Sequence, residues 1–598
     1  MNDLLRSGKN FRKPTFIFIS LLLLFEAPVY SAKKKSKSKG EVQENPVEST
    51  ETVNTADSTE TSENAVRLPS NTKPRTYFYK IDESILAGVE NGSPEAITEA
   101  MHKLHRNDSD YAENEKVLMN ISASIMELLW PSRKITWETF SDVEINSYTG
   151  AINSVKNGVF DSSTGNVDFL STVIPTLVLF IPNANQSAYE QCEQPVLSAV
   201  ELRPDSVLSN YITGKYFEKK GNYGEAELFF KTAYEKSPKT LELILAYSDI
   251  LVKNNKAAGA VQIISTVPTE YLDQLSVLKH KAYVYFSNMD YTEAETYVAK
   301  VLQQTPNDLD FLLFRARIFI EKNDYIHAVS LLDMYARQND TNIDYLVLRA
   351  RVQLDWSKNT AAATETIEKA LRLYPQNENA LMLATRISSI TDAPVAGKYA
   401  DELAEIVLEK NPQNTEALIY AMEGLAQREN WEEAYVISSK LLKTSHANPD
   451  VVLSHVTECI ELKKNTEAFE VAAAAYAENP QNETILQAYI LAYCVVNTKD
   501  ASLDLINSLI TSTSSKMKSY LYYRRSFLQY SEDNSLADLR SSLIANPRNS
   551  DALFRLYEIY YAKEDYRKAQ YYLRQVVAIN PNDSSTRRLN EALTQLIK

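Results

Sequence analysis

The sequence predicts an all-α protein in which antiparallel helical hairpins stack into a solenoid, and three observations lead to this fold class. The chain has 598 residues, more than one hydrophobic core accommodates, so it needs several domains or a repeat array. Glycine is scarce at 13 residues, which leaves little room for β-hairpins and favours helices joined by short polar turns. Prolines recur at intervals close to 34 residues or twice that value. Because proline cannot continue a helix, this period indicates a helical hairpin repeated many times.

The first 32 residues have the layout of a secretory signal peptide. Basic residues come first, an apolar run occupies residues 15–25, and the small residues Ser31 and Ala32 follow. The run is shorter than the roughly 20 residues of a membrane-spanning helix, so we expect cleavage and export to the periplasm or cell envelope. Several lysines directly after Ala32 disfavour export. They leave open a second interpretation, in which residues 15–25 anchor the chain in the inner membrane.

Two segments separate this N-terminus from the repeats. Residues 33–74 begin rich in Lys and Ser, continue rich in Glu and Thr, and contain almost no large apolar side chains. Such a segment cannot bury enough surface to offset the entropy of ordering it, so we expect a disordered tether. Residues 75–172 show helical periodicity but fit the repeat poorly. They are either degenerate repeats that cap the array or a separate helical domain.

The repeat is defined by its prolines and by the small and aromatic residues between them. Residues 207–240 place Gly214 on a first helix, Tyr223 in the turn, and Ala226 and Phe230 on a second helix. Small residues let the two helices approach, and aromatic side chains fill the space around them. The recurring prolines are Pro204, Pro238, Pro306, Pro375, Pro412, Pro480, Pro547 and Pro581.

This pattern resembles the tetratricopeptide repeat, which has a small residue on the first helix, a Gly-x-Tyr turn, and Ala, Phe, Ala and Pro on the second. The resemblance covers residues 173–583, about twelve repeats, and residues 584–598 follow as a closing helix that caps the array. It implies a right-handed superhelical solenoid. It also implies that the first helices line a concave groove in which proteins or peptides dock.

Composition narrows the function. A formal net charge of −15 and the lack of a long basic stripe argue against nucleic-acid binding, which depends on Lys and Arg neutralising phosphates. The cysteines Cys192, Cys459 and Cys494 are too few and too scattered for a disulfide framework. Cys459 and Cys494 lie one repeat apart on helical positions that should face the core. They are expected to be buried free thiols, with a disulfide between them as the alternative.

Motifs for catalysis are absent from the sequence. It contains no phosphate-binding glycine loop, no dinucleotide-binding glycine run, no His-Glu-x-x-His and no Cys-x-x-Cys pair. His102 and His105 have a spacing that could hold a metal, but no third ligand lies near them in the sequence. The four remaining histidines have no evident Ser or Cys partners. We therefore expect no enzyme, no cofactor, no metal site and no small-molecule substrate. The four histidines are His280, His327, His446 and His455.

Residues 34 positions apart should stack along the groove, and two such columns carry positive charge or aromatic rings. Like charges held side by side would favour an acidic peptide or carboxylate as the ligand. The alternative is that these arginines pair with acids of a neighbouring helix. The first column is Lys281, Arg315 and Arg349, and the second is Tyr283, Arg317 and Arg351.

A second candidate patch is Tyr520, Arg524 and Phe527, because aromatic and Arg side chains are typical interface anchors. Its alternative is core packing, since aromatic residues at helical spacing often face inward. Together these features predict a protein-interaction scaffold of the bacterial cell envelope that assists complex assembly. Two other functions stay open: an enzyme or polymer-binding module in residues 75–172, and a structural spacer without a specific ligand. Membrane contact is expected only through an uncleaved N-terminal segment.

Overall fold

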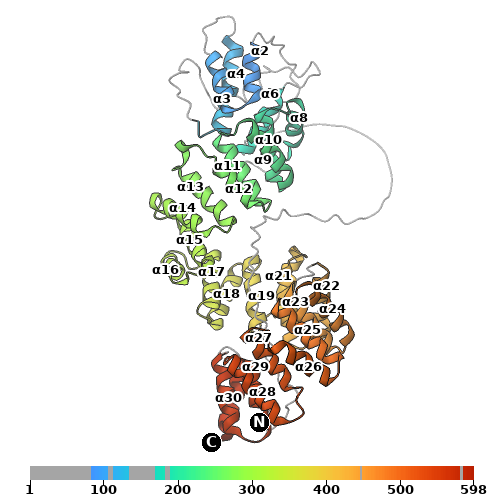
Figure 1. The fold of residues 1–598 in the computed structure, drawn as a ribbon. Helices are drawn as coiled ribbons and strands as arrows, with labels where there is room; N and C mark the ends of the chain where they lie inside the picture. Colours follow the sequence, from blue (N-terminus) through green and yellow to red (C-terminus); the bar gives the residue numbers. More distant parts are fainter. Residues whose placement is uncertain are drawn as a thin grey trace, which may run out of the picture. The chain divides into compact units, whose positions relative to one another are not determined.

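The computed structural model describes residues 82–104, 112–133, 169–181, 189–444, 448–579 and 584–597. The predicted signal peptide (1–32) and tether (33–74) lie outside these ranges. The described residues form helices and no strand, apart from an isolated antiparallel bridge between Val395 and Lys398. Consecutive helices pair as antiparallel hairpins (Figure 1). The predicted all-α solenoid of tandem hairpins is therefore confirmed. None of the described helices is both long enough and apolar enough to cross a membrane.

Two compact units divide the described chain between Phe311 and Leu312. The helices of the first unit are α2 (Glu83–Asn91), α3 (Pro94–Leu104), α4 (Ala112–Leu129), α6 (Phe169–Val173), η2 (Ile174–Phe180), α8 (Glu193–Leu202), α9 (Val207–Lys220), α10 (Tyr223–Lys236), α11 (Leu241–Lys253), α12 (Ala257–Ile264), η3 (Thr269–Tyr271), α13 (Leu275–Ser287) and α14 (Tyr291–Gln304). The boundary between the units falls within α15 (Leu309–Glu321).

The second unit continues the same alternation of first and second helices. Its helices are α16 (Tyr325–Ala336), α17 (Ile343–Asp355), α18 (Thr360–Leu373), α19 (Glu378–Thr391), α20 (Ala400–Lys410), α21 (Thr415–Gln427), α22 (Trp431–Thr444), α23 (Pro449–Glu461), α24 (Asn465–Glu478), α25 (Glu483–Val496), α26 (Lys499–Ile510), α27 (Ser515–Ser526), α28 (Glu532–Ala545), α29 (Ser550–Ala562), α30 (Tyr566–Ile579) and α31 (Ser584–Ile597).

The N-terminal helices share one hydrophobic core with the first hairpins. Trp130, fully buried after α4, donates from Nε1 to the carbonyl oxygen of Gly92 at 3.0 Å. Its ring stacks on Tyr211 of α9 with centroids 4.8 Å apart. The Ser206 hydroxyl donates to the carbonyl oxygen of Glu90 at 2.6 Å. The described part of residues 75–172 thus packs directly on the first hairpins.

The Asn-Pro-x-Asn phrase ends one hairpin and starts the next. Asn411 is the C-cap of α20, and the side chain of Asn414 caps α21 by accepting from the Ala417 backbone N–H at 3.0 Å. An Asn at the N-cap satisfies one of the backbone donors that a helix start leaves unpaired. Asn482 and Asn549 cap α25 and α29 in the same way.

The turn inside many hairpins passes through one residue with positive φ. Non-glycine residues in this left-handed conformation include Met289 (61°), Glu429 (61°) and Lys463 (61°). Glycine occupies the equivalent turn after α9, where Gly221 has φ 79°. Side chains disfavour this region of backbone space, so the tight turn costs conformational energy in each hairpin that lacks glycine.

Close helix approach depends on small residues, as the sequence predicts. At Gly214 of α9, an added Cβ would lie 2.6 Å from the Phe230 ring of α10. Phe230 is fully buried, and so is Ala226 beside it. The absence of a side chain at residue 214 therefore lets the aromatic ring fill the space between the helices.

Candidate functional site

Two arginines of the predicted columns, Arg349 and Arg351, form ion pairs with acids of other helices. Arg351 of α17 contacts Glu321 of α15, with 2.7 Å between Nη1 and Oε1 and 3.2 Å between Nη2 and Oε2. Arg351 Nε also lies 3.6 Å from Oδ2 of Asp355, whose Oδ1 is 2.7 Å from Nη2 of Arg386 on α19. We call Glu321, Arg351, Asp355 and Arg386 the charge ladder.

The charge ladder alternates in sign and is largely shielded from solvent. The Glu321 side chain is 1% exposed, and the side chains of the other three members are 15–16% exposed. Arg349 likewise pairs with Asp333 of α16 at 2.9 Å. Arg349 and Arg351 therefore fit the alternative in which acids of neighbouring helices pair with them. Whether the two columns bind a partner stays a prediction.

The other members of the two columns differ in exposure. Lys281 is buried, with Nζ 5.4 Å from the centroid of the Tyr297 ring, and burial together with Lys300 lowers its pKa. Tyr283 is 47% exposed and packs edge-on against Phe311 at 5.5 Å. Tyr283 thus presents accessible ring surface, whereas Lys281 presents little.

Two further arginines of the columns lie on α15. Arg315 and Arg317 are half-buried, and the Arg315 guanidinium lies 5.6 Å from the Phe319 ring centroid. Such a cation–π contact adds modest stability.

The second predicted patch is partly core. Burial raises the pKa of Tyr520 to about 12, and its hydroxyl is buried with no hydrogen-bond partner among the described residues. Arg524 and Arg555 both approach the Phe527 ring, at 5.6 and 4.9 Å. Tyr520 therefore fits the packing alternative, while Arg524 and Phe527 remain half-buried.

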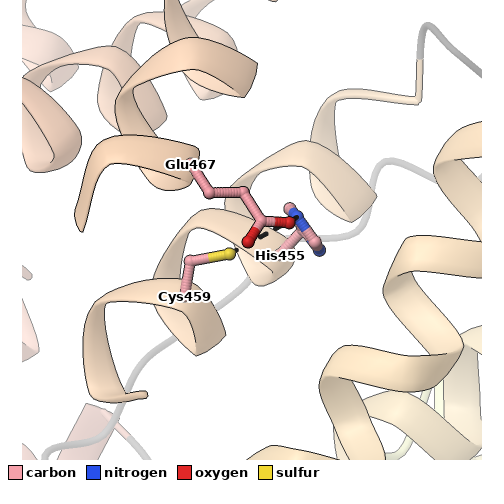
Figure 2. Close-up of side chains that lie close together, drawn as sticks. All are labelled: His455, Cys459 and Glu467. Carbon is pink, nitrogen blue, oxygen red and sulfur yellow. Dashed lines mark hydrogen bonds and ion pairs between the residues drawn. The ribbon is translucent and has the colours of Figure 1, made fainter. Parts of the chain in front are cut away.

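The sequence did not predict a buried polar cluster on α23 and α24. His455 and Cys459, one helical turn apart on α23, and Glu467, in the first turn of α24, point toward one another (Figure 2). Cys459 Sγ lies 3.4 Å from His455 Nε2, and Glu467 Oε1 lies 3.7 Å from the same nitrogen. His455 and Cys459 are buried, and the Glu467 side chain is 40% exposed.

A second layer of polar groups surrounds this cluster. Ser438 of α22 contacts His455 Nδ1 at 2.8 Å and donates to Oε2 of the fully buried Glu458. The Tyr435 hydroxyl donates to Glu467 Oε1 at 2.7 Å. Burial raises the pKa of Glu458 to about 7 and that of Cys459 to about 12, and it lowers the pKa of His455.

The cluster does not have the order of a catalytic triad. Glu458 contacts Ser438 rather than His455, so no carboxylate orients the imidazole from behind. Ser438 is fully buried, and the raised pKa of Cys459 disfavours a reactive thiolate. The donor set suits coordination or internal hydrogen bonding instead.

Two expectations about single residues need correction. His455 has both a Ser and a Cys partner, and His280 contacts the Ser248 hydroxyl at 2.9 Å, so the expectation that these histidines have none is wrong. The i, i+4 spacing of His455 and Cys459 was the sequence signal for the cluster. The three cysteines are free, and Cys494 is half-buried rather than fully buried. His105 and His446 lie outside the described residues.

Residues 75–172 contribute an open hollow beside α3. Its lining includes His102 and the ion pair between Glu95 and Arg133. These groups do not form a nucleophile–base pair, and an active site in this region stays an untested alternative.

One family model and several solved structures match this chain. No curated protein matches the sequence. Among solved structures, Pseudomonas aeruginosa pilF is 19% identical, with 33% of this chain and 88% of that chain covered and a TM-score of 0.27. The APC/C hetero-tetramer Cut9-Hcn1 is 12% identical over 85% of this chain and 98% of that chain, with a TM-score of 0.39. Yeast Tom70 is 12% identical, with 67% of this chain and 90% of that chain covered and a TM-score of 0.37. The family model of the tetratricopeptide repeat matches residues 219–279, and this match supports the family that the sequence resembles.

Proposed function

We propose that this chain is a protein-interaction scaffold of the bacterial cell envelope, which binds partner proteins or peptides along the first helices of its hairpins and assists complex assembly. One observation carries the proposal: ion pairs join successive first helices of the second unit, as Arg351 joins α17 to α15 and Arg386 joins α19 to α17. Helices held in register repeat their side chains at regular intervals. An extended or helical segment of a partner can then contact several repeats at once.

Tyr283 is the best single position at which to test binding. It lies on a first helix, belongs to the second predicted column, and is 47% exposed. A tyrosine ring supplies large contact area at low entropic cost. An acidic partner at Arg349 or Arg351 would compete with Asp333 or Glu321 for the guanidinium group.

The binding experiment is cross-linking in the native envelope followed by affinity capture and mass spectrometry. We expect a discrete partner with the wild type, and a loss of about tenfold or more with Tyr283→Ser. Tyr571→Ser is the matched control, because Tyr571 is 63% exposed but lies on the second helix α30. Equal capture by all three proteins would move the binding site away from Tyr283. The absence of any reproducible partner would favour the spacer alternative.

Localisation has a separate test, since it depends on residues 1–74. Cell fractionation and the intact mass of the purified protein should show an envelope protein that has lost about 32 residues. An uncleaved chain in the membrane fraction would favour anchoring by residues 15–25, and an uncleaved chain in the cytosolic fraction would contradict the envelope proposal.

A further inference from the structure

We propose that His455, Cys459 and Glu467 form a binding site for a thiophilic divalent cation of the Zn²⁺ class (Figure 2). These side chains supply an imidazole nitrogen, a sulfur and a carboxylate oxygen, all within 4.8 Å of one another. Imidazole, thiolate and carboxylate are the ligand types that proteins use for zinc. Neither the repeat pattern nor the scaffold function requires such a site.

The spacing of the donor atoms fits one metal ion. Zinc binds sulfur at about 2.3 Å and nitrogen at about 2.0 Å, so two such ligands of a tetrahedral ion lie roughly 3.5 Å apart. The separation of Cys459 Sγ and His455 Nε2 is 3.4 Å, and that of His455 Nε2 and Glu467 Oε1 is 3.7 Å. Only small side-chain movements are needed to place an ion between the three atoms.

The second layer directs a nitrogen lone pair into the site. A hydroxyl has one hydrogen, and Ser438 donates it to Oε2 of Glu458. The other Ser438 contact, 2.8 Å to His455 Nδ1, must then be a hydrogen bond donated by Nδ1–H. This tautomer leaves His455 Nε2 unprotonated and facing Cys459 and Glu467. Metal-bound histidines are typically held in this way through their other ring nitrogen.

His455 Nε2, Cys459 Sγ and Glu467 Oε1 bring few hydrogens of their own to the site. The only hydrogen that the three groups themselves supply is that of the Cys459 thiol. One further hydrogen comes from the Tyr435 hydroxyl, which donates to Glu467 Oε1 at 2.7 Å and holds the carboxylate in place. A cation would take the place of the thiol hydrogen between Cys459 Sγ and His455 Nε2 and would accept a further lone pair of the Glu467 carboxylate.

Two carboxylates and one ammonium group lie around the site. Glu467 and Glu458 are the acidic groups, and Lys464 Nζ lies 4.0 Å from Glu467 Oε2 and over the Tyr435 ring.

On binding, the Cys459 S–H bond breaks, a metal–sulfur bond forms, and one proton leaves to solvent. The Glu467 side chain is 40% exposed, which provides an entry path and room for water as a fourth ligand. The ion would join α23 to α24 across the turn at Lys463.

Cobalt is the probe for the test, since Co²⁺ replaces zinc and is coloured. We expect the reduced, chelator-treated full chain to develop thiolate-to-cobalt charge-transfer and tetrahedral d–d bands, which stoichiometric Zn²⁺ abolishes and excess Mg²⁺ does not. Cys459→Ser should remove the charge-transfer band, whereas Cys494→Ser, one repeat further on, should keep it.

Two milder variants keep the test informative if Cys459→Ser fails to fold. Glu467→Gln should weaken cobalt binding about 10- to 100-fold, while Glu470→Gln, one turn further along α24, should not. Ser438→Ala should weaken binding by a similar factor through the loss of its contact to His455. Absence of a charge-transfer band in the wild type, or equal binding by both glutamate variants, would overturn the proposal.

Discussion

Glu423 on α21 illustrates how burial sets the energy of a single charged residue. Its environment raises the pKa to about 8 from an ordinary value of 4.5, first by burial and then by the charge of Asp450 on α23, while Arg386 opposes the shift. Because the folded-state pKa lies above the unfolded one, the stability that Glu423 contributes is complete below about pH 4.5. It is lost as pH rises toward 8.

Glu423→Gln should therefore remove a pH dependence. At pH 5 the variant and the wild type should be similar, and near pH 8 the variant should be more stable by roughly 1–3 kcal/mol. Hydrogen exchange of α21 at the two pH values measures this difference. A variant that is less stable than the wild type at pH 8 would show that the ionised carboxylate is well accommodated.

Gly214 illustrates a steric constraint, because its position has no room for a side chain. Gly214→Ala would place a methyl group 2.6 Å from the Phe230 ring, so we expect destabilisation of about 1–3 kcal/mol in urea unfolding. Gly224→Ala is the control, because nothing lies within 4 Å of its added Cβ in α10. That variant should be neutral or gain up to about 1 kcal/mol, since alanine favours helix. Equal losses in both would indicate a helix effect rather than a packing effect.

The sequence predicted which residues pack between the helices, but it did not predict which polar side chains contact one another. Gly214 and Phe230 follow from the repeat, since a small residue and a ring recur at set places in it. Ser438 and His455 lie 17 residues apart on different helices, and neither position is specified by the repeat. Polar contacts of this kind depend on the exact rotation of each helix about its axis. Hydrophobic periodicity predicts the buried face of a helix but not that rotation.

At the scale of the helix, the two arginines of α17 offer a matched comparison. Arg351→Ala would leave Glu321 buried at 1% exposure without its bidentate partner, and we expect a loss of about 3–5 kcal/mol. Arg349→Ala breaks a pair whose acid, Asp333, is 54% exposed, and should cost about 1 kcal/mol or less. Urea unfolding followed by circular dichroism measures both. Similar losses would mean that the exposure of the acid does not govern the energy.

Helix boundaries were predictable because proline and asparagine mark them chemically. Asn411, Asn414 and the proline between them end α20 and cap α21. The sequence left open whether these arginines bind a ligand or pair with acids of a neighbouring helix, and it named no particular acid. Arg351 and Glu321 are 30 residues apart, four fewer than one repeat, so an acid at this offset is the signal to search for in such sequences.

At the scale of the whole molecule, the stability of each hairpin should depend mainly on its neighbours. The last helix, α31, covers α30 through Leu589 and Leu593, which are 6% and 1% exposed. Deletion of residues 584–598 should accelerate hydrogen exchange in α29 and α30 by about tenfold or more and leave α9 to α12 unchanged. Faster exchange in α9 to α12 would instead indicate one cooperative unit.

The non-glycine turn residues with positive φ are positions at which a substitution by glycine could stabilise the fold. A non-glycine residue in this conformation costs roughly 1–2 kcal/mol, and glycine recovers part of that at the expense of a more flexible unfolded chain. Met289, Glu429 and Lys463 each hold this position in a different hairpin. One codon change in each turn could therefore adjust a single hairpin without touching the faces that neighbouring helices share. During evolution, such a chain can offset a destabilising change on a binding face by a compensating change in a turn of the same repeat.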